Sequence, residues 1–162
     1  MATGVTNQYA VRDFVRSDQR VVQALINEGL AQRFGKVNES MNPDLFDIEE
    51  TYIEQDAVFI VVEHNGAIIG CGALIHEEGS NETARIVRVS VRPKYQGHGL
   101  GHKISDLLIE RAREKGYREI LVETNSDWES ALKLYQSLGF REYSRTNVPE
   151  YGYTEVNMFL DL

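Results

Sequence analysis

The fold is decided by residues 86–109, whose sequence is IVRVSVRPKYQGHGLGHKISDLLI. The first residues are apolar, which is typical of a buried strand, and Pro93 ends this strand because proline cannot donate to a strand ladder. Glycine then occurs at alternate positions, Gly97, Gly99 and Gly101. Apolar side chains at helical spacing follow. The segment therefore predicts a strand, a glycine loop and an amphipathic helix in direct succession.

The glycine loop has the features of an anion-binding site. A glycine lacks a Cβ atom, so each of these glycines can adopt positive φ and let a polyphosphate approach the main chain closely. The first amides of a helix have no intrahelical partner, and the helix dipole adds about half a positive charge there. We therefore expect an anion to bind at residues 96–102.

The spacing of the glycines excludes two common phosphate loops. A Rossmann fingerprint needs G-x-G-x-x-G, and no glycine follows Gly101 until Gly116. A Walker loop needs G-x-x-x-x-G-K-[ST], and Lys103 and Ser105 do not have that spacing. The anion site is therefore of another kind.

The segment resembles the acyl-coenzyme A signature of the GNAT superfamily of N-acetyltransferases, [RQ]-x-x-G-x-[GA], which Gln96, Gly99 and Gly101 match. Further along the chain, residues 131–140, ALKLYQSLGF, resemble the second signature of that family, A-x-x-L-Y-x-x-x-G-F. Both signatures stand in the order that the family has. The resemblance extends over essentially the whole chain and is strongest over residues 56–142.

The apolar periodicity predicts an α/β (α+β) fold with the element order βααβββαβαββ. The expected elements are strand 9–15, helix 19–35, a shorter helix 44–53, strands 57–62 and 67–75 joined by an Asn-Gly turn, the strand before the glycine loop, helix 99–115, strand 118–123, helix 127–138 and two late strands. This order implies a mixed sheet with helices on both faces. GNAT membership would make the sheet mostly antiparallel, with about six or seven strands.

Size and composition predict one domain, residues 1–162, and the resemblance implies that this domain is of the GNAT-like acetyltransferase kind. A chain of 162 residues with 42% hydrophobic and 26% charged residues has ordinary globular values. No apolar run reaches the ~18 residues that a membrane-spanning helix needs, so we expect no membrane partner. The first residues lack a secretion signal, and the single cysteine, Cys71, excludes a disulfide framework. We therefore expect a cytoplasmic protein.

The net charge of −8 argues against nucleic acid as a partner, because binding to phosphates needs a basic surface. An acidic protein would suit a cationic acceptor, but the same charge also serves solubility. The sequence leaves the oligomeric state open, with a homodimer as one option.

The resemblance implies acetyl-CoA as co-substrate, with its diphosphate on the loop amides and its pantetheine arm beside the preceding strand. The implied cofactor-binding residues are Val89, Ser90, Val91, Gln96, Gly97, His98, Gly99, Leu100, Gly101, His102 and Asn125. No metal is expected, because His98 and His102 flank the anion site without an evident third ligand.

The implied reaction is transfer of an acetyl group to a primary amine of a small molecule or peptide, by direct attack of the amine on the thioester. Tyr135 matches the tyrosine that protonates the coenzyme A sulfur in the family. A phenol with a pKa near 10 stays protonated at neutral pH and can therefore act as this donor. The other interpretation is a tyrosine that only packs on its helix.

The sequence departs from the family where a general base is expected. Arg85 stands where many members have a glutamate, and an arginine cannot accept a proton at physiological pH. The remaining candidates are Glu77, Glu78, Glu82, Glu123, His76 and an ordered water. An amine that arrives neutral often enough would need no dedicated base. The departure keeps open an alternative function, a weakly active or inactive acyl-CoA-binding sensor. Tyr135 counts against this alternative, because a pure binder needs no proton donor there.

A second departure lies in the other signature, where Trp128 occupies the place of an asparagine, with Asn125 nearby. Trp128 either packs at the start of its helix or contacts the coenzyme. The resemblance implies that the first two helices and the loop between the late strands line the acceptor pocket. Candidates for that pocket are Phe34, Phe46, Tyr52, Tyr151 and Tyr153.

Overall fold

A computed structural model describes residues 9–162 and has the predicted element order. The strands are β1 (Tyr9–Asp13), β2 (Val58–His64), β3 (Ala67–His76), β4 (Thr83–Val91), β5 (Glu119–Asn125), β6 (Arg141–Val148) and β7 (Tyr153–Asp161). The helices are α1 (Gln19–Phe34), α2 (Ile48–Thr51), α3 (Leu100–Glu114) and α4 (Glu129–Ser137). Within this part of the chain, none of the helices has the length and apolar character that crossing a membrane requires.

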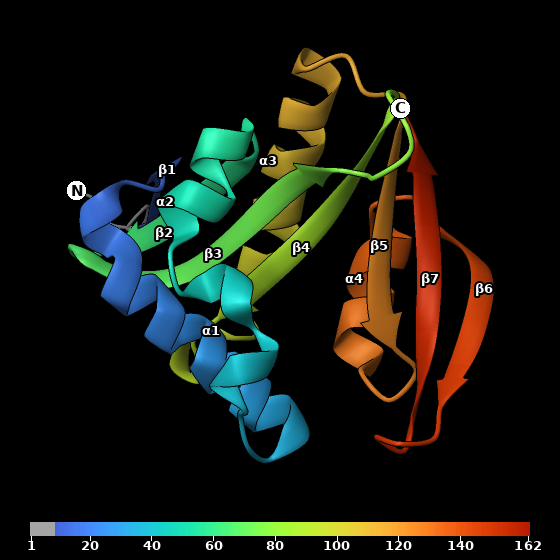
Figure 1. The fold of residues 1–162 in the computed structure, drawn as a ribbon, viewed down its shortest axis with the longest axis horizontal. Coiled ribbons are helices and arrows are strands. Elements are labelled where there is room, and N and C mark those ends of the chain that lie inside the picture. Colours follow the sequence, from blue (N-terminus) through green and yellow to red (C-terminus); the bar gives the residue numbers. More distant parts are fainter. Residues whose placement is uncertain (1–8) are drawn as a thin grey trace, which may run out of the picture.

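The strands form one seven-stranded sheet in the order β1-β2-β3-β4-β5-β7-β6 (Figure 1). All neighbouring pairs are antiparallel except β4 and β5, which are parallel and joined by α3. The prediction of a mixed, mostly antiparallel sheet is confirmed. The parallel pair lies in the middle of the sheet, and the glycine loop and α3 connect its two strands.

The turn between β2 and β3 is the predicted Asn-Gly hairpin. Asn65 and Gly66 have φ of 52° and 84°. Positive φ at both central residues is the requirement of a type I′ turn, whose twist matches that of the flanking strands.

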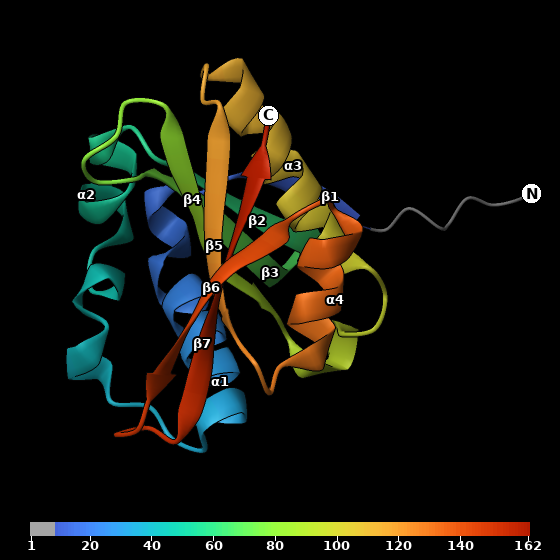
Figure 2. The ribbon, with the colours of Figure 1, turned by 90° about the vertical axis from the view of Figure 1, so that its right-hand side faces the viewer.

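Helices cover both faces of the sheet, with α1 and α2 on one face and α3 and α4 on the other (Figure 2). Alternation along β2 divides its side chains between two cores. Val62 packs in the core that contains Ile104 of α3. Val61, its neighbour, packs in the core that contains Leu25 of α1. The sheet is therefore buried on both faces at its centre, as a sheet with two helical layers requires.

The second predicted helix is shorter than residues 44–53. Only Ile48–Thr51 is α-helical, with 3₁₀ turns at Pro43–Leu45 and Ile53–Gln55 on either side. Asp47 caps the helix, since its side chain accepts a hydrogen bond from the Glu50 N–H at 3.0 Å. An aspartate inside the apolar pattern therefore starts a new helix instead of continuing one.

Two glycines, one in β3 and one in α1, give opposite predictions for the stability of their alanine variants. A Cβ atom at Gly72 of β3 would lie 2.6 Å from Cγ2 of Ile104 and 3.1 Å from Cδ1 of Leu108, both on α3. We expect Gly72→Ala to lower the free energy of unfolding by about 1–3 kcal/mol, because α3 must move away from the sheet. A shift in the urea midpoint measures this.

Gly29→Ala is the matched control. A Cβ atom at this α1 residue would meet the Oγ atom of Ser90, which can rotate away. Alanine also favours a helix interior over glycine by about 1 kcal/mol. The variant should be as stable as the wild-type protein or more so. If both variants lose the same stability, the close approach of α3 is not the cause.

Candidate active site

β4 and β5 separate from each other to form a gap in the middle of the sheet. They pair only where Thr83–Arg85 of β4 faces Glu119–Leu121 of β5. Beyond Arg85 the two strands diverge, as Figure 1 shows. The sequence could not show this divergence, because it depends on how the two strands pack and not on either alone.

A β-bulge lies in β4 beside this gap. Cys71 of β3 pairs with Ser90, whereas Ala73 pairs with Val87, so β4 contains one residue more than β3 across this step. Arg88 in the bulge has a φ of 58°, a conformation that is uncommon for a residue with a side chain.

The side chain of Arg88 holds the bulge against the segment before α2. Its guanidinium donates to both carboxylate oxygens of Asp44, at 2.7 and 3.0 Å, and to Oδ1 of Asn42 at 3.1 Å. The Tyr52 hydroxyl also donates to Asp44, at 2.5 Å. Burial alone would raise the pKa of Asp44, but the bonds from Arg88 and Tyr52 outweigh it and leave that pKa below its usual value. The network therefore connects β4, at the edge of the gap, to the segment before α2.

The gap opens into a cavity of about 1090 Å³. Its walls are formed by α1, β4, the glycine loop, the start of α3, β5, α4 and the β6–β7 hairpin. The predicted site residues in its lining are Val89, Ser90, Val91, Gln96, Gly97, Gly99, Leu100, Gly101, His102, Asn125 and Tyr135. His98 is exposed and lies outside the lining. The fold thus brings both sequence signatures to one cavity.

The glycine loop presents its backbone as predicted, with one correction. Gly97 and Gly99 have φ of 82° and 79°, and a Cβ atom at either would meet nothing within 4 Å. Gly99 caps α3 without a side-chain hydrogen bond, so no capping side chain covers the first amides of that helix. The expectation of positive φ is wrong for Gly101, which is already helical; a Cβ atom there would lie 3.4 Å from Cδ2 of Leu134 on α4.

Gln96 shapes the loop through its side chain. Its amide nitrogen donates to the carbonyl oxygen of Val91 at 2.9 Å and to Oε1 of Gln32 at 3.0 Å. The first bond folds the loop back on the end of β4, and the second joins it to α1.

Tyr135 lies on α4 with 6% of its surface exposed, and its ring packs edge-on against Phe140 at 5.4 Å between centroids. Burial raises the pKa of Tyr135 to about 12, an effect that the nearby Arg33 and Ser105 oppose. The Ser105 hydroxyl is buried beside it and makes no regular hydrogen bond within the described residues. The phenol therefore holds its proton at neutral pH.

Among the candidate bases, only Glu123 lines the cavity. Arg85 binds both carboxylate oxygens of Glu77, at 2.8 and 2.9 Å, and His76 lies 3.4 Å from the hydroxyl of Tyr117. Glu78 and Glu82 are exposed outside the lining. Glu123 is half-exposed, and its Oε1 atom lies 4.0 Å from Nη1 of Arg85. Its partial burial raises its pKa, the neighbouring Glu155 adds to this rise, and Arg85 opposes it.

One wall of the cavity is aromatic. The guanidinium carbon of Arg33 lies 4.2 Å from the ring centroid of Trp128. The ring of Phe34 packs edge-on against Trp128, with 5.5 Å between ring centroids. The ring centroid of Tyr153 lies 6.0 Å from that of Phe34 and 6.3 Å from that of Tyr151. Trp128 thus lines the cavity at the start of α4.

Two of the five aromatic residues expected in the acceptor pocket lie outside this lining. Tyr52 is buried in the core beneath α1, where its ring packs against Phe59. Phe46 is exposed.

Asn125 forms the turn from β5 into α4. Its Oδ1 atom accepts a hydrogen bond from the Asp127 N–H at 2.8 Å, and its carbonyl oxygen accepts one from the Trp128 N–H at 3.0 Å. The side chain is buried, and the residue belongs to the cavity lining. Asn125 therefore positions the neighbouring wall, and contact with a coenzyme stays a prediction.

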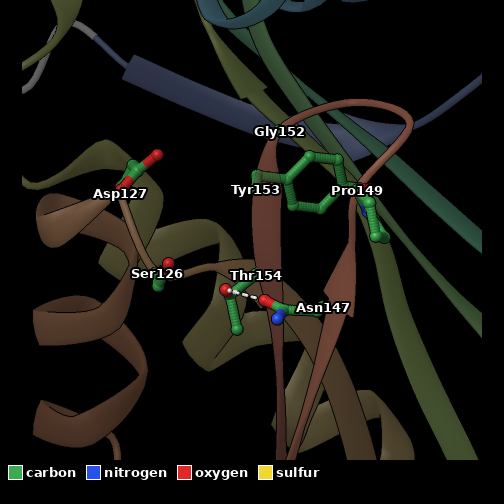
Figure 3. A pocket seen from close by; sticks show the side chains of 7 residues that line it. All are labelled: Ser126, Asp127, Asn147, Pro149, Gly152, Tyr153 and Thr154. Carbon is green, nitrogen blue, oxygen red and sulfur yellow. Dashed lines mark hydrogen bonds between the residues drawn. The ribbon is translucent and has the colours of Figure 1, made fainter.

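A smaller pocket of about 250 Å³ lies beside the cavity, and Figure 3 shows the residues that line it. Ser126 and Asp127 form one side, and the β6–β7 hairpin forms the other. On the hairpin, the hydroxyl of Thr154 donates to Oδ1 of Asn147 at 2.8 Å. Asp127 and Tyr153 belong to both linings, so the two spaces are neighbours.

The model of one protein family, the acetyltransferase (GNAT) family, matches residues 22–140 of the chain. The chain belongs to the GNAT family. The match includes the gap, the glycine loop and Tyr135, and it extends beyond half of the sequence.

Acetyltransferases of bacteria and animals are among the relatives. The chain is 29% identical over 100 residues to YjgM, an uncharacterized N-acetyltransferase of Escherichia coli K12, with 61% of this chain and 60% of that protein covered. It is 28% identical over 144 residues to the IAA acetyltransferase of Azospirillum brasilense, with 88% and 90% covered. With N-acetyltransferase family 8 member 2 of Rattus norvegicus the identity is 27%, over 65% of this chain and 48% of the relative. The chain therefore spans only about half to three-fifths of the length of several relatives.

Solved GNAT structures have the same fold. The Salmonella typhimurium protein yncA, determined with its cofactor acetyl-CoA, superposes with a TM-score of 0.79 at 21% identity, over 95% of this chain and 94% of that one. A GNAT acetyltransferase of Staphylococcus aureus Mu50 gives 0.80 at 23% identity, over 94% and 99%. At this identity the likeness establishes the shared GNAT fold.

The GNAT signatures located the glycine loop and Tyr135, but two arginines of the site had no sequence signal. Arg33 lies in the last turn of α1, where the sequence contains no motif. Arg88 is a single charged residue in the apolar part of β4. Only the tertiary structure brings Arg33 to Trp128 and Arg88 to Asp44.

Proposed function

We propose that the chain is an acetyl-CoA-dependent N-acetyltransferase that acts on the primary amine of a small molecule or peptide. The observation that carries this proposal is the pairing in one cavity of Tyr135, a buried phenol, with Glu123, a carboxylate whose pKa is raised. One group can donate a proton and the other can accept one, which is the combination that amine acetylation needs.

The residues present fit acetyl-CoA. The uncovered amides at the start of α3 and the open space around Gly97 and Gly99 suit a diphosphate. Val89 and Ser90 follow the bulge on the edge of the gap, where the pantetheine arm would lie as an added strand. The coenzyme supplies an activated thioester, and the chain supplies position and proton transfer.

Glu123 and Tyr135 divide the proton transfers between them. The neutral amine nitrogen forms the bond to the thioester carbon, and Glu123 takes the proton that this nitrogen loses as the amide forms. As the carbon–sulfur bond breaks, Tyr135 gives its proton to the departing sulfur. The raised pKa of Glu123 brings this carboxylate nearer to the pH at which it must act as a base.

The test is release of coenzyme A thiol from acetyl-CoA across a panel of amines, amino acids, polyamines and peptides. Turnover with at least one amine is the expected result. Tight binding of coenzyme A by calorimetry without turnover on any amine would favour the sensor alternative.

Glu123→Gln should lower kcat/KM by about tenfold at neutral pH, since neutral amine still attacks without a base. A base acts when ionised, so wild-type kcat/KM, expressed per neutral amine, should fall as the pH drops through the raised pKa of Glu123, and the variant should lose this dependence. The pH profile of kcat/KM is the measurement.

Glu155→Gln is the matched control. It removes the charge of Glu155, which contributes to the raised pKa of Glu123. The acid limb of the kcat/KM profile should therefore move to lower pH. An unchanged acid limb in Glu123→Gln would assign the base to another group.

A further inference from the structure

Arg33 is a cation without an anionic partner in a cavity wall. Within residues 9–162 its guanidinium makes no ion pair, and its contact is the face of Trp128 at 4.2 Å. Arg88, the other arginine in the lining, is bound to Asp44 at 2.7 Å. Burial lowers the pKa of Arg33, and the neighbouring Tyr135 opposes this effect. The side chain is solvent-exposed, so the donors of its unpaired guanidinium remain available to an anion that enters the cavity.

Either the coenzyme or the acceptor could supply this anion, and the positions of the two within the cavity distinguish them. The anionic diphosphate of a coenzyme fits the glycine loop at the start of α3, whereas Arg33 lies near Tyr135, where the reacting thioester is neutral. The acceptor enters this second region, between the aromatic wall and Glu123. The anion that Arg33 suits therefore belongs to the acceptor.

The charges of the two walls differ in sign. Arg33 lies on α1, whereas Glu123 and Asp127 come from β5 and the turn after it. An acceptor with amines alone would bring only positive charge to Arg33, which is repulsive. An acceptor with an amine and a carboxylate satisfies both walls.

We propose that the acceptor is an α-amino acid and that Arg33 binds its carboxylate while Glu123 receives the proton of its amine. This inference rests on the proposed function. A planar guanidinium binds a carboxylate through two parallel hydrogen bonds, and stacking on Trp128 fixes its plane. Phe34 and Tyr153 beside this pair favour an apolar side chain on the amino acid.

The experiment compares amino acids with their amides, which retain the amine and the side chain and lack the charge. The wild-type protein should prefer the acids by about 10–100-fold in kcat/KM, the size of one charged hydrogen bond. Arg33→Met should lose this preference mainly through a higher KM for the acid, with the amide unaffected. Arg33→Lys should retain part of it, because the charge remains without the fork. Arg20→Met, an exposed arginine on the same helix outside the lining, is the control and should behave as wild type.

Three results would overturn the inference. In the first, the wild-type protein uses acid and amide equally well; in the second, the preference survives in Arg33→Met. In the third, Arg33→Met raises the KM of acetyl-CoA and not that of the acceptor, which would assign Arg33 to the coenzyme. Failure of the proposed function has a different signature, since thiol release would then be absent with every amine.

Discussion

Tyr135→Phe is expected to lower kcat by about 100-fold or more, with the KM of acetyl-CoA close to the wild-type value. The phenol donates its proton only as the carbon–sulfur bond breaks, so its loss acts on the transition state and not on binding. Burial keeps the pKa of Tyr135 at about 12, and the donor is therefore protonated across the usual assay range. Steady-state thiol release measures both constants.

Two controls separate chemistry from packing. Phenylalanine keeps the edge-on contact with Phe140, so the thermal midpoint of Tyr135→Phe should stay near that of the wild-type protein. Tyr143→Phe removes a hydroxyl from an exposed tyrosine of β6 and should leave kcat unchanged. A wild-type kcat in Tyr135→Phe would mean that Tyr135 only packs on its helix.

The strands and three of the helices were predictable because their signals are local, whereas the mostly antiparallel pairing of the sheet was implied by the GNAT resemblance. Asn65 and Gly66 specify a turn by themselves, and the alternation along β2 follows from strand geometry. The shortened α2 was not predicted because its apolar rhythm continues through Asp47, where a capping hydrogen bond interrupts the backbone pattern. The side chain of Asp47 competes with the helix for backbone hydrogen bonds, and this local competition sets the start of α2.

The site was predictable only where its residues belong to contiguous motifs. The glycine loop and Tyr135 lie in two signatures that the GNAT resemblance identified. Glu123 was one of several candidates, and what separates it from Glu77 is that Glu123 belongs to the cavity lining, whereas Glu77 lies outside it. Arg33 reaches the site from a helix whose sequence carries no motif.

The ion pair between Arg88 and Asp44 is expected to stabilise both the fold and the bulge beside the gap. Arg88→Met should lower the free energy of unfolding by about 2–3 kcal/mol, because it leaves the charge of Asp44 without its main partner. This is below the roughly 3–5 kcal/mol of a fully buried pair, since 20% and 24% of the two side chains are exposed. Urea denaturation measures the effect. Arg92→Met, which breaks a more exposed pair with Glu28, should lower stability by less than about 1 kcal/mol.

A double-mutant cycle shows whether the pair itself holds the bulge. Asp44→Leu combined with Arg88→Met removes both charges, so the double variant should lose less stability than the sum of the single variants, with a coupling energy of about 2 kcal/mol. The positive φ of residue 88 persists only while the surroundings enforce it, and the released bulge should relax. Because the pantetheine arm would lie along Val89 and Ser90 beside this bulge, we expect Arg88→Met both to raise the KM of acetyl-CoA and to lower kcat. A coupling energy near zero with an unchanged kcat would mean that pairing with β3 alone keeps the bulge in place.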